Sequence, residues 1–251
     1  MRYIGIIPAR FASSRFPGKP IADLCGHPVI EHVYRRVSMV LDDVWVATDD
    51  IRIADVVRGF DGNVVMTSSA HCCGTERCRE AFVTIDSGAD IVIDIQGDEP
   101  FIDPEAIRIL MACMECNDNP SIGTLSHRIY PLDCSVLTDP NRPKVIVDND
   151  MYAVSFLREA DAGLLAAGNI YRHIGVYAFR SEILSRIALL PRSDMEKRYS
   201  LEQYRWLENG YRIRVGVCPC THTVAIDTPA DLEIARKYYI DHIDCYDNRT
   251  R

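Results

Sequence analysis

The sequence predicts an α/β fold of three layers, with a mostly parallel sheet and an inserted antiparallel β lobe. The first observation is the Ile-rich run Tyr3–Pro8, which is typical of a strand buried on both faces of a parallel sheet. The second is the alternation of strand-like and helix-like segments up to residue 116. The third is a change after Ser121, where short β-rich segments follow one another.

The alternating part is expected to contain three further strands, at residues 44–48, 63–66 and 90–95. Helices are expected at residues 28–40, 51–60 and 104–116, with another after the loop TSSAHCCGTERCRE. Asp49 and Asp50 end the second of these strands and precede a helix, and we interpret them as helix caps in preference to ligands.

The β-rich part begins with SIGTLSHRI, and the segments KVIVD and YAVSFL are expected to pair in antiparallel fashion around Asn149-Asp150. A strand from His173 would place His173 and Tyr177 on one face, because side chains alternate with a period of two. A helical stretch at 196–209 and a strand at 211–218 follow. Thr228 is the expected N-cap of the last helix, with Asp231 completing a capping box.

Three cations lie in the loop that follows the first strand. Arg10, Arg15 and Lys19 fall within ten residues and alternate with Ser13, Ser14 and Gly18. Cations, hydroxyls and backbone N–H groups at the mouth of a strand suit a polyphosphate, although a solvated basic turn is the alternative. The stretch has neither a G-x-G-x-x-G dinucleotide motif nor a P-loop, because Pro20 follows Gly18-Lys19.

Composition narrows the function classes. A formal net charge of −8 and a pI near 5.4 argue against a nucleic-acid or membrane-surface partner, which would require a basic field. No apolar run reaches the length of about 18 residues that a membrane helix needs, and the start lacks a signal-peptide pattern. We therefore expect a cytoplasmic protein. Its 251 residues suit one large α/β domain or a domain with an appended lobe.

Ten cysteines raise the question of a zinc site. Close pairs occur at Cys72-Cys73, Cys113-x-x-Cys116 and Cys218-x-Cys220, but no second pair follows at finger-like spacing. Half-buried small side chains are the favoured interpretation, and structural zinc remains the minor alternative.

The segment IPARFASSRFPGKPIADLCGHPVIEHVYRR resembles the opening of the CMP-sugar-acid synthetase family, most closely its 3-deoxy-manno-octulosonate (Kdo) cytidylyltransferases. Similarity extends over nearly the whole chain. It implies one nucleotidyltransferase domain of the nucleotide-diphospho-sugar transferase type over residues 1–251. It also implies a lobe at about residues 121–180 that contacts the sugar and forms a homodimer. The implied reaction joins CTP and Kdo to give CMP-Kdo and pyrophosphate.

The resemblance also assigns roles to single residues. Arg15, Lys19 and Asp98 would be catalytic, and the nucleotide would contact Ala9, Arg10, Ser14, Arg15, Lys19, Gly74 and Arg77. Relatives read H-x-S-G-T-D-R where this chain has Cys73 and Glu76 in place of the Ser and the Asp. Arg77 lies at a helix start, which disfavours a cation unless an anion is near.

Asp98 follows the strand at residues 90–95, and carboxylates at the carboxyl ends of parallel strands are well placed for a ligand. A turn-forming Asp is the structural alternative. Hard carboxylate oxygens suit magnesium, and Asp98 and Asp227 match the magnesium ligands of the family. Asp227 precedes the cap of the last helix and has no evident structural role there.

The resemblance places the sugar acid against Gln96, Arg158, His173, Tyr177, Glu202 and Gln203. Arg158 is the candidate for the sugar carboxylate because a guanidinium binds that group in bidentate fashion. Tyr199 stands where relatives carry a Glu. Together with Cys73 and Glu76 it motivates an alternative acceptor, such as an amino-substituted octulosonate, another keto-sugar acid or a phosphonate. A non-enzymatic nucleotide-binding protein on the same scaffold is the more distant alternative.

Overall fold

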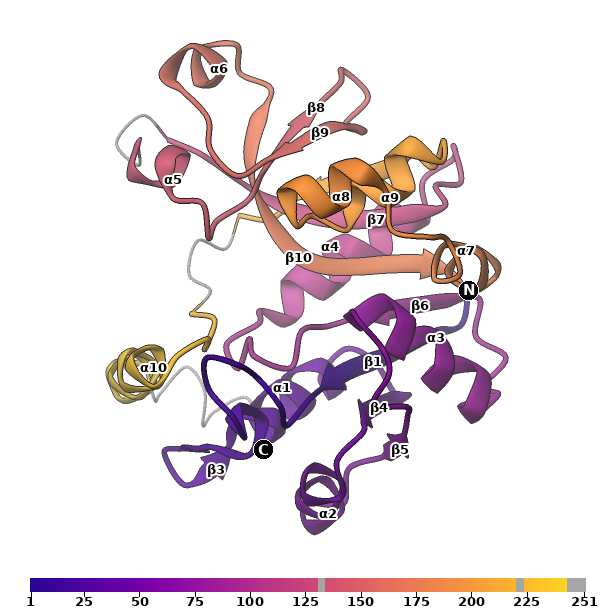
Figure 1. The fold of residues 1–251 in the computed structure, drawn as a ribbon, viewed down its shortest axis with the longest axis vertical. Helices are drawn as coiled ribbons and strands as arrows, with labels where there is room; N and C mark the ends of the chain where they lie inside the picture. Colours follow the sequence, from indigo (N-terminus) through magenta and orange to yellow (C-terminus); the bar gives the residue numbers. More distant parts are fainter. Residues whose placement is uncertain (131–133, 220–223, 243–251) are drawn as a thin grey trace. The chain divides into compact units, whose positions relative to one another are not determined.

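The structure is a computed structural model that describes residues 1–130, 134–219 and 224–242. The chain forms two compact units (Figure 1). Unit 1 comprises the described parts of Met1–Pro104 and His222–Arg251, and unit 2 those of Glu105–Thr221. Residues 243–251 of the polar tail, together with Cys220, lie outside the described residues.

Unit 1 contains a parallel sheet of four strands, β1 (Tyr3–Ala9), β4 (Val44–Thr48), β5 (Val64–Met66) and β6 (Ile91–Asp94). Their order is β6-β1-β4-β5, and each neighbouring pair is parallel. The central position of β1 explains its composition, because Ile4, Ile6 and Ile7 are fully buried. The predicted parallel sheet is therefore confirmed, with strand ends displaced by one residue at β1, β5 and β6.

Helices cover both faces of this sheet. A Cβ atom on Gly5 would lie 3.2 Å from Val37 of α1 (Val29–Ser38), whereas one on Gly74, the first residue of α3 (Gly74–Ile85), would lie 3.4 Å from Pro8. Positions 5 and 8 of a strand point to opposite faces, so α1 and α3 flank β1 and make the three layers that were predicted. α2 (Ile51–Gly59) contacts β4 and β5.

The chain reverses its direction of travel across this sheet between β1 and β6. From β1 it proceeds outward to β4 and β5, and then returns to place β6 on the other side of β1. Ligands of open α/β sheets bind beyond the carboxyl ends of the strands at such a switch point. The loops that follow β1 and β6 therefore begin at the place where this fold supports a site.

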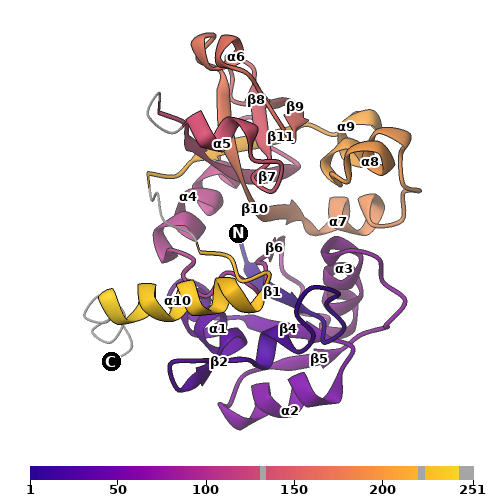
Figure 2. The same ribbon diagram turned by 60° about the vertical axis from the view of Figure 1, so that its left-hand side comes forward.

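A short helix, a hairpin and a longer helix also belong to the described part of unit 1. A short helix η1 (Lys19–Ile21) follows the cationic loop and leads into a hairpin of β2 (Asp23–Leu24) and β3 (His27–Pro28). The C-terminal helix α10 (Pro229–Asp241), yellow in Figure 2, returns to this hairpin, where the Arg236 guanidinium donates to the Asp23 carbonyl over 2.7 Å. The predicted capping box of Thr228 and Asp231 is confirmed at its start.

Unit 2 carries the antiparallel strands. Strands β7 (Ile122–Arg128), β10 (Ile170–Arg180), β8 (Lys144–Val147) and β9 (Ala153–Leu157) pair in that order, each pair antiparallel, and β11 (Ile213–Val217) pairs parallel with β7. The predicted pairing of KVIVD with YAVSFL is confirmed. Helices α4 (Pro104–Met114), α5 (Cys134–Thr138), α6 (Ala162–Ala166) and α7 (Ser181–Ile187) connect or follow these strands.

The helical stretch predicted at residues 196–209 is wrong as a single element. The structure has two helices, α8 (Asp194–Tyr199) and α9 (Gln203–Glu208), separated at Ser200, whose φ of 52° is left-handed. The Arg158 guanidinium supplies the physical reason, because it donates to the carbonyl oxygens of Tyr199 over 3.1 Å and of Ser200 over 2.6 Å. It thereby satisfies carbonyls that a continuous helix would have used internally.

Among the described residues, no helix is both long enough and apolar enough to cross a lipid bilayer.

Candidate active site

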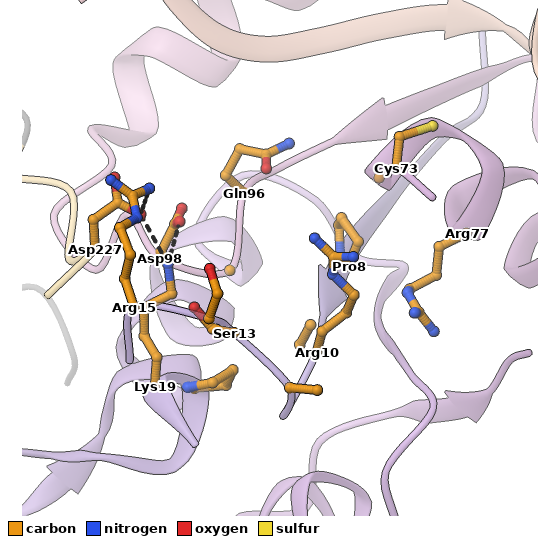
Figure 3. Close-up of a pocket in the computed structure, with 16 residues that line it drawn as sticks. Pro8, Arg10, Ser13, Arg15, Lys19, Cys73, Arg77, Gln96, Asp98 and Asp227 are labelled. Atoms are coloured by element: carbon orange, nitrogen blue, oxygen red, sulfur yellow. Dashed lines mark hydrogen bonds and ion pairs between the residues drawn. The ribbon is translucent and has the colours of Figure 1, made fainter. Parts of the chain in front are cut away.

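A pocket of about 430 Å³ lies in unit 1 beyond the carboxyl ends of β1 and β6 (Figure 3). The loop after β1, the loop after β6, the start of α3 and the residue before α10 all contribute to it. Its lining is Pro8, Ala9, Arg10, Ala12, Ser13, Ser14, Arg15, Lys19, Pro20, Cys73, Gly74, Arg77, Gln96, Gly97, Asp98 and Asp227. The pocket therefore brings together all predicted nucleotide, catalytic and metal residues, with Gln96 from the sugar set.

The cationic loop is folded around Phe11. The carbonyl of Phe11 accepts hydrogen bonds from the Gly18 and Ser13 N–H groups, both over 2.9 Å, and the Arg52 guanidinium lies 3.3 Å from the centre of the Phe11 ring. Gly18 has a left-handed φ of 75° and packs against the same ring, where a side chain would be strained. These contacts close the loop and deliver Lys19 to the pocket. The sequence reasoning missed the role of Phe11.

Lys19 lies between two carboxylates. Its Nζ is 2.7 Å from Asp98 Oδ2 and 3.3 Å from Asp227 Oδ1, and Arg15 Nη2 is 2.9 Å from the same Asp227 oxygen. Figure 3 shows this group at one side of the pocket and Cys73 and Arg77 at the other. Only 12% of the Lys19 side chain is exposed, so solvent screens its charge less than that of Arg15, which is 58% exposed.

Two hydrogen bonds position the segments that carry the distant aspartates. The Ile226 N–H donates to the Asp98 carbonyl over 2.9 Å, and the Asp231 carboxylate accepts from the Asp227 N–H over 3.1 Å. Burial raises the pKa of Asp231, but hydrogen bonds from Thr228 and the backbone outweigh it and hold that pKa below its ordinary value. Asp231 therefore stays ionised and fixes the residue that carries the second carboxylate.

An apolar cluster supports the same arrangement. Ile226, Phe101 and Leu24 are among its buried members, and Phe16 packs against it from the cationic loop. Ile226, Phe101 and Phe16 each lie within three positions of a charged residue of the site. Leu24 lies in the hairpin that follows the cationic loop. Gly97 is required for close approach, because a Cβ there would lie 3.0 Å from the Pro8 carbonyl oxygen.

The carboxylates fit a divalent cation. Asp98 and Asp227 both direct an oxygen at the same atom, Lys19 Nζ, so two hard anionic ligands already face one cation. Magnesium is bound in proteins by one or two carboxylates together with phosphate oxygens and water. The donor set of this chain is of that kind.

Arg77 is held within the fold at the opposite wall. It is 1% exposed, and its guanidinium donates to Thr67 Oγ1 over 2.5 Å and to Asp49 Oδ2 over 3.1 Å. The anion expected near this helix start is thus Asp49, and the interpretation of Asp49 as a helix cap is wrong. Asp50 does cap α2, accepting from the Arg52 N–H over 3.0 Å. The sequence offered one signal for Asp49, its place at a strand end.

Most residues predicted to bind the sugar belong to unit 2, whereas Gln96 belongs to unit 1 and donates to Asp94 Oδ1 over 3.3 Å. In unit 2, His173 Nε2 is hydrogen-bonded to Thr124 Oγ1 over 3.0 Å, and Gln203 donates to the Tyr177 hydroxyl. The rings of His173 and Tyr177 lie 5.6 Å apart. The register of β10 against β7 shifts between Ile174 and Tyr177. The period of two that side chains follow in a regular strand is therefore interrupted between His173 and Tyr177.

Burial lowers the pKa of His173 from 6.5 to about 3. Between these pH values the unfolded chain binds a proton that the folded chain does not, so this residue makes the free energy of unfolding fall as the pH falls. We expect His173→Gln to remove that dependence, at about 1.4 kcal/mol per pH unit. Denaturant unfolding of the variant and the wild type from pH 7 to pH 4 measures the difference. The exposed His242→Gln serves as control, and equal slopes for His173→Gln and the wild type would contradict the expectation.

Arg158 and Glu202 occupy defined positions within unit 2. Besides Tyr199 and Ser200, the Arg158 guanidinium donates to the Pro140 carbonyl over 3.0 Å, and burial lowers its pKa. Glu202 Oε1 lies 3.7 Å from Arg205 Nη2 at the start of α9. Whether Arg158 binds a sugar carboxylate stays a prediction.

The cysteines of α4 and its end are free thiols. Burial raises the pKa of Cys113 to about 11, which disfavours the thiolate that zinc requires. Within residues 1–130, 134–219 and 224–242, no three His, Cys, Asp or Glu side chains are grouped so as to hold a metal.

The fold and the pocket define an α/β enzyme scaffold with a pocket lined by cations and carboxylates at its switch point. Residues 4–213 match the family model described as Cytidylyltransferase. The chain therefore belongs to the cytidylyltransferase family, as its sequence predicted.

Curated relatives cover nearly the full length. A 3-deoxy-manno-octulosonate cytidylyltransferase from Parabacteroides distasonis is 48% identical over 245 residues, which are 94% of this chain and 97% of that protein. A protein of the same name from Thermodesulfovibrio yellowstonii is 44% identical over 250 residues, covering 93% of this chain and 96% of the relative.

Solved structures agree with this placement. A CMP:2-keto-3-deoxy-manno-octonic acid synthetase complexed with CTP has a TM-score of 0.88 and 36% identity, covering 96% of this chain and 100% of that one. A 4-diphosphocytidyl-2C-methyl-D-erythritol synthase from Anaerococcus prevotii shares the fold alone, with a TM-score of 0.62 and 18% identity over 95% of this chain and 99% of the other.

Proposed function

We propose that the chain transfers the cytidylyl group of CTP to 3-deoxy-manno-octulosonate, giving CMP-Kdo and pyrophosphate. The observation that carries the proposal is the pocket at the switch point, where Lys19 and Arg15 meet Asp98 and Asp227. Relatives at 41–48% identity bear the name of this activity, and a solved neighbour is a complex with CTP.

The chemistry requires positioning and charge neutralisation. The anomeric hydroxyl of the sugar loses its proton to solvent and attacks the α-phosphorus, so that a new P–O bond forms. The bond between the α-phosphorus and the oxygen that bridges to the β-phosphate breaks, and pyrophosphate leaves. Arg10, Arg15 and Lys19 would stabilise the β- and γ-phosphates as negative charge develops on the leaving group. The nucleoside would lie toward Ala9, Ser14, Gly74 and Arg77, which line the same pocket.

Asp98 and Asp227 would hold magnesium, because two carboxylates already face one cation there. The bound ion would neutralise phosphate charge and acidify the attacking hydroxyl. Lys19 contacts both carboxylates from the cationic loop, so it would keep them in place and present its own charge to the phosphates.

The acceptor would be recognised by Gln96 and by Arg158, His173, Tyr177, Glu202 and Gln203 of unit 2. Arg158 offers a guanidinium for the carboxylate of the acid. The ring of Tyr199 lies 5.5 Å from that of Tyr204. Because Tyr199 stands where relatives carry a Glu, another keto-sugar acid or a phosphonate is the alternative acceptor.

We further propose that the protein acts in the cytoplasm as a homodimer. Its two compact units would serve as a nucleotidyltransferase domain with a lobe at about residues 121–180 that supplies the sugar site and the dimer contact. The antiparallel strands β7 to β10 lie in that segment and are the part that supports this division. Sedimentation of the purified protein measures the assembly state, and a monomer at micromolar concentration would contradict the homodimer.

A pyrophosphate-release assay tests the function. CTP and the other nucleoside triphosphates are each combined with a panel of keto-sugar acids in the presence of magnesium. We expect release with CTP and Kdo. Release with CTP and a different acid would select the alternative acceptor, and CTP binding without release with any acid would indicate a nucleotide-binding protein that is not an enzyme.

A further inference from the structure

The loop of residues 67–73 forms the approach to one wall of the pocket. It begins at the end of β5 and runs into α3, and its last residue, Cys73, lines the pocket beside Gly74 and Arg77. The position of the Cys73 and Gly74 backbone in the pocket therefore depends on the conformation of the loop that precedes it.

Two glutamates of α3 reach back to this loop. Glu76 and Glu80 lie four residues apart and hence on one side of the helix. Glu80 Oε2 accepts a hydrogen bond from the Ser68 N–H over 2.9 Å, and Glu76 Oε2 accepts one from the Cys72 N–H over 2.8 Å. Each carboxylate thus holds one backbone amide of the loop, near its two ends.

The His71 ring contacts both glutamates. Its Nε2 is hydrogen-bonded to Glu80 Oε2, and its Nδ1 lies 3.8 Å from Glu76 Oε2. Burial raises the pKa of Glu80, but the Ser68 N–H and His71 outweigh it and hold that pKa below its ordinary value, so the carboxylate remains charged. The side chains of His71, Glu76 and Glu80 are 20, 22 and 35% exposed, which limits the screening of this contact by solvent.

Arg77 holds the first residues of the loop from the other direction. Besides Thr67 Oγ1, its guanidinium donates to the Ser68 carbonyl over 3.3 Å. Ser68 is therefore bound through its N–H by Glu80 and through its carbonyl by Arg77. The middle of the loop depends on His71, whose ring spans the two glutamates.

We propose that His71 is a positioning residue for nucleotide binding, which fixes the loop of residues 67–73 through Glu76 and Glu80 so that Cys73 and Gly74 form a preorganised wall. The inference rests on the proposed function and deepens it, because the ligand is the nucleoside triphosphate. It also gives Glu76 a role, since its carboxylate reaches the Cys72 N–H. Neither Lys19 nor Asp98 belongs to the set of side chains that holds this loop. We therefore expect loss of His71 to weaken nucleotide binding and to leave turnover unchanged.

Hydrogen exchange and CTP binding test this inference together. In His71→Ala we expect faster exchange of the Ser68 and Cys72 amides without nucleotide. We also expect a rise of about tenfold in the Kd for CTP, the size of one charge-assisted hydrogen bond. kcat at saturating CTP should stay close to that of the wild type. Glu80→Gln should act in the same direction, and the double variant should be no worse than His71→Ala, because the two residues act as one unit.

His27→Ala is the matched control, since His27 also pairs with a glutamate in unit 1, Glu31, over 3.0 Å, but belongs to β3 and not to the loop of residues 67–73. It should change neither the Kd nor the exchange at Ser68 and Cys72. If His71→Ala does not fold, His71→Asn, which keeps an N–H donor toward Glu80, takes its place with a smaller expected effect.

Three results would overturn the inference, each in a recognisable way. Unchanged exchange at Ser68 and Cys72 would show that His71 does not fix the loop. Faster exchange with an unchanged Kd for CTP would show that the loop does not position the nucleotide. A wild-type protein that binds no CTP would refute the proposed function itself, whereas the first two results leave that function intact.

Discussion

Replacing Lys19 with alanine is expected to lower kcat about 10²–10³-fold, the cost of removing one preorganised charge from a transition state. The Lys19 side chain is less exposed than that of Arg15, the other cation of this loop that contacts Asp227. Its Nζ lies 2.7 Å from Asp98 and 3.3 Å from Asp227. Without it, the carboxylates lose their common partner and the leaving pyrophosphate loses a counter-charge. Pyrophosphate release at saturating substrates and magnesium measures the effect.

Lys237→Ala is the control for this prediction, because Lys237 is an exposed lysine of unit 1 on α10 and does not line the pocket. Its turnover should equal that of the wild type. Thermal unfolding should show that Lys19→Ala remains folded, since its side chain contributes charge to the site and not apolar packing. Near-normal turnover of folded Lys19→Ala would remove Lys19 from the mechanism.

Asp98→Asn is expected to lower kcat by a similar factor, about 10²–10³-fold, even when magnesium is saturating. The amide keeps the size of the side chain but gives up the charge that a hard cation requires. The Asp98 carbonyl still accepts from the Ile226 N–H, so the fold around the site should persist. The Kd for Mn²⁺, measured by electron paramagnetic resonance in the presence of CTP, should also rise, and an unchanged thermal unfolding transition should show that the variant remains folded.

Asp55→Asn provides the matched control, since Asp55 is exposed on α2 and pairs with Arg58 over 2.9 Å. It should leave turnover and Mn²⁺ binding unchanged. An Asp98→Asn protein that binds Mn²⁺ as tightly as the wild type and turns over normally would exclude Asp98 from the metal site.

Local signals predicted the elements of unit 1 well. The Ile-rich run of β1, the amphipathic pattern of α1 and the capping box of α10 each depend on residues that are neighbours in sequence. The helical stretch at residues 196–209 failed for the opposite reason. Its break at Ser200 depends on Arg158, which lies more than forty residues earlier in the chain and reaches the Tyr199 and Ser200 carbonyls only through the tertiary fold.

The sequence by itself determined which groups of this protein carry the chemistry, because cations, carboxylates and strand ends are properties of residue type and local pattern. It also determined the parallel sheet, since β1 is apolar enough to be buried on both faces. Only the tertiary structure decided which of those groups meet. Asp98 and Asp227 converge on Lys19, Asp49 pairs with Arg77, and His71 spans Glu76 and Glu80 because chain topology and packing set these distances. No local periodicity encodes the contacts of Lys19 with Asp98 and Asp227, which lie 79 and 208 residues away along the chain.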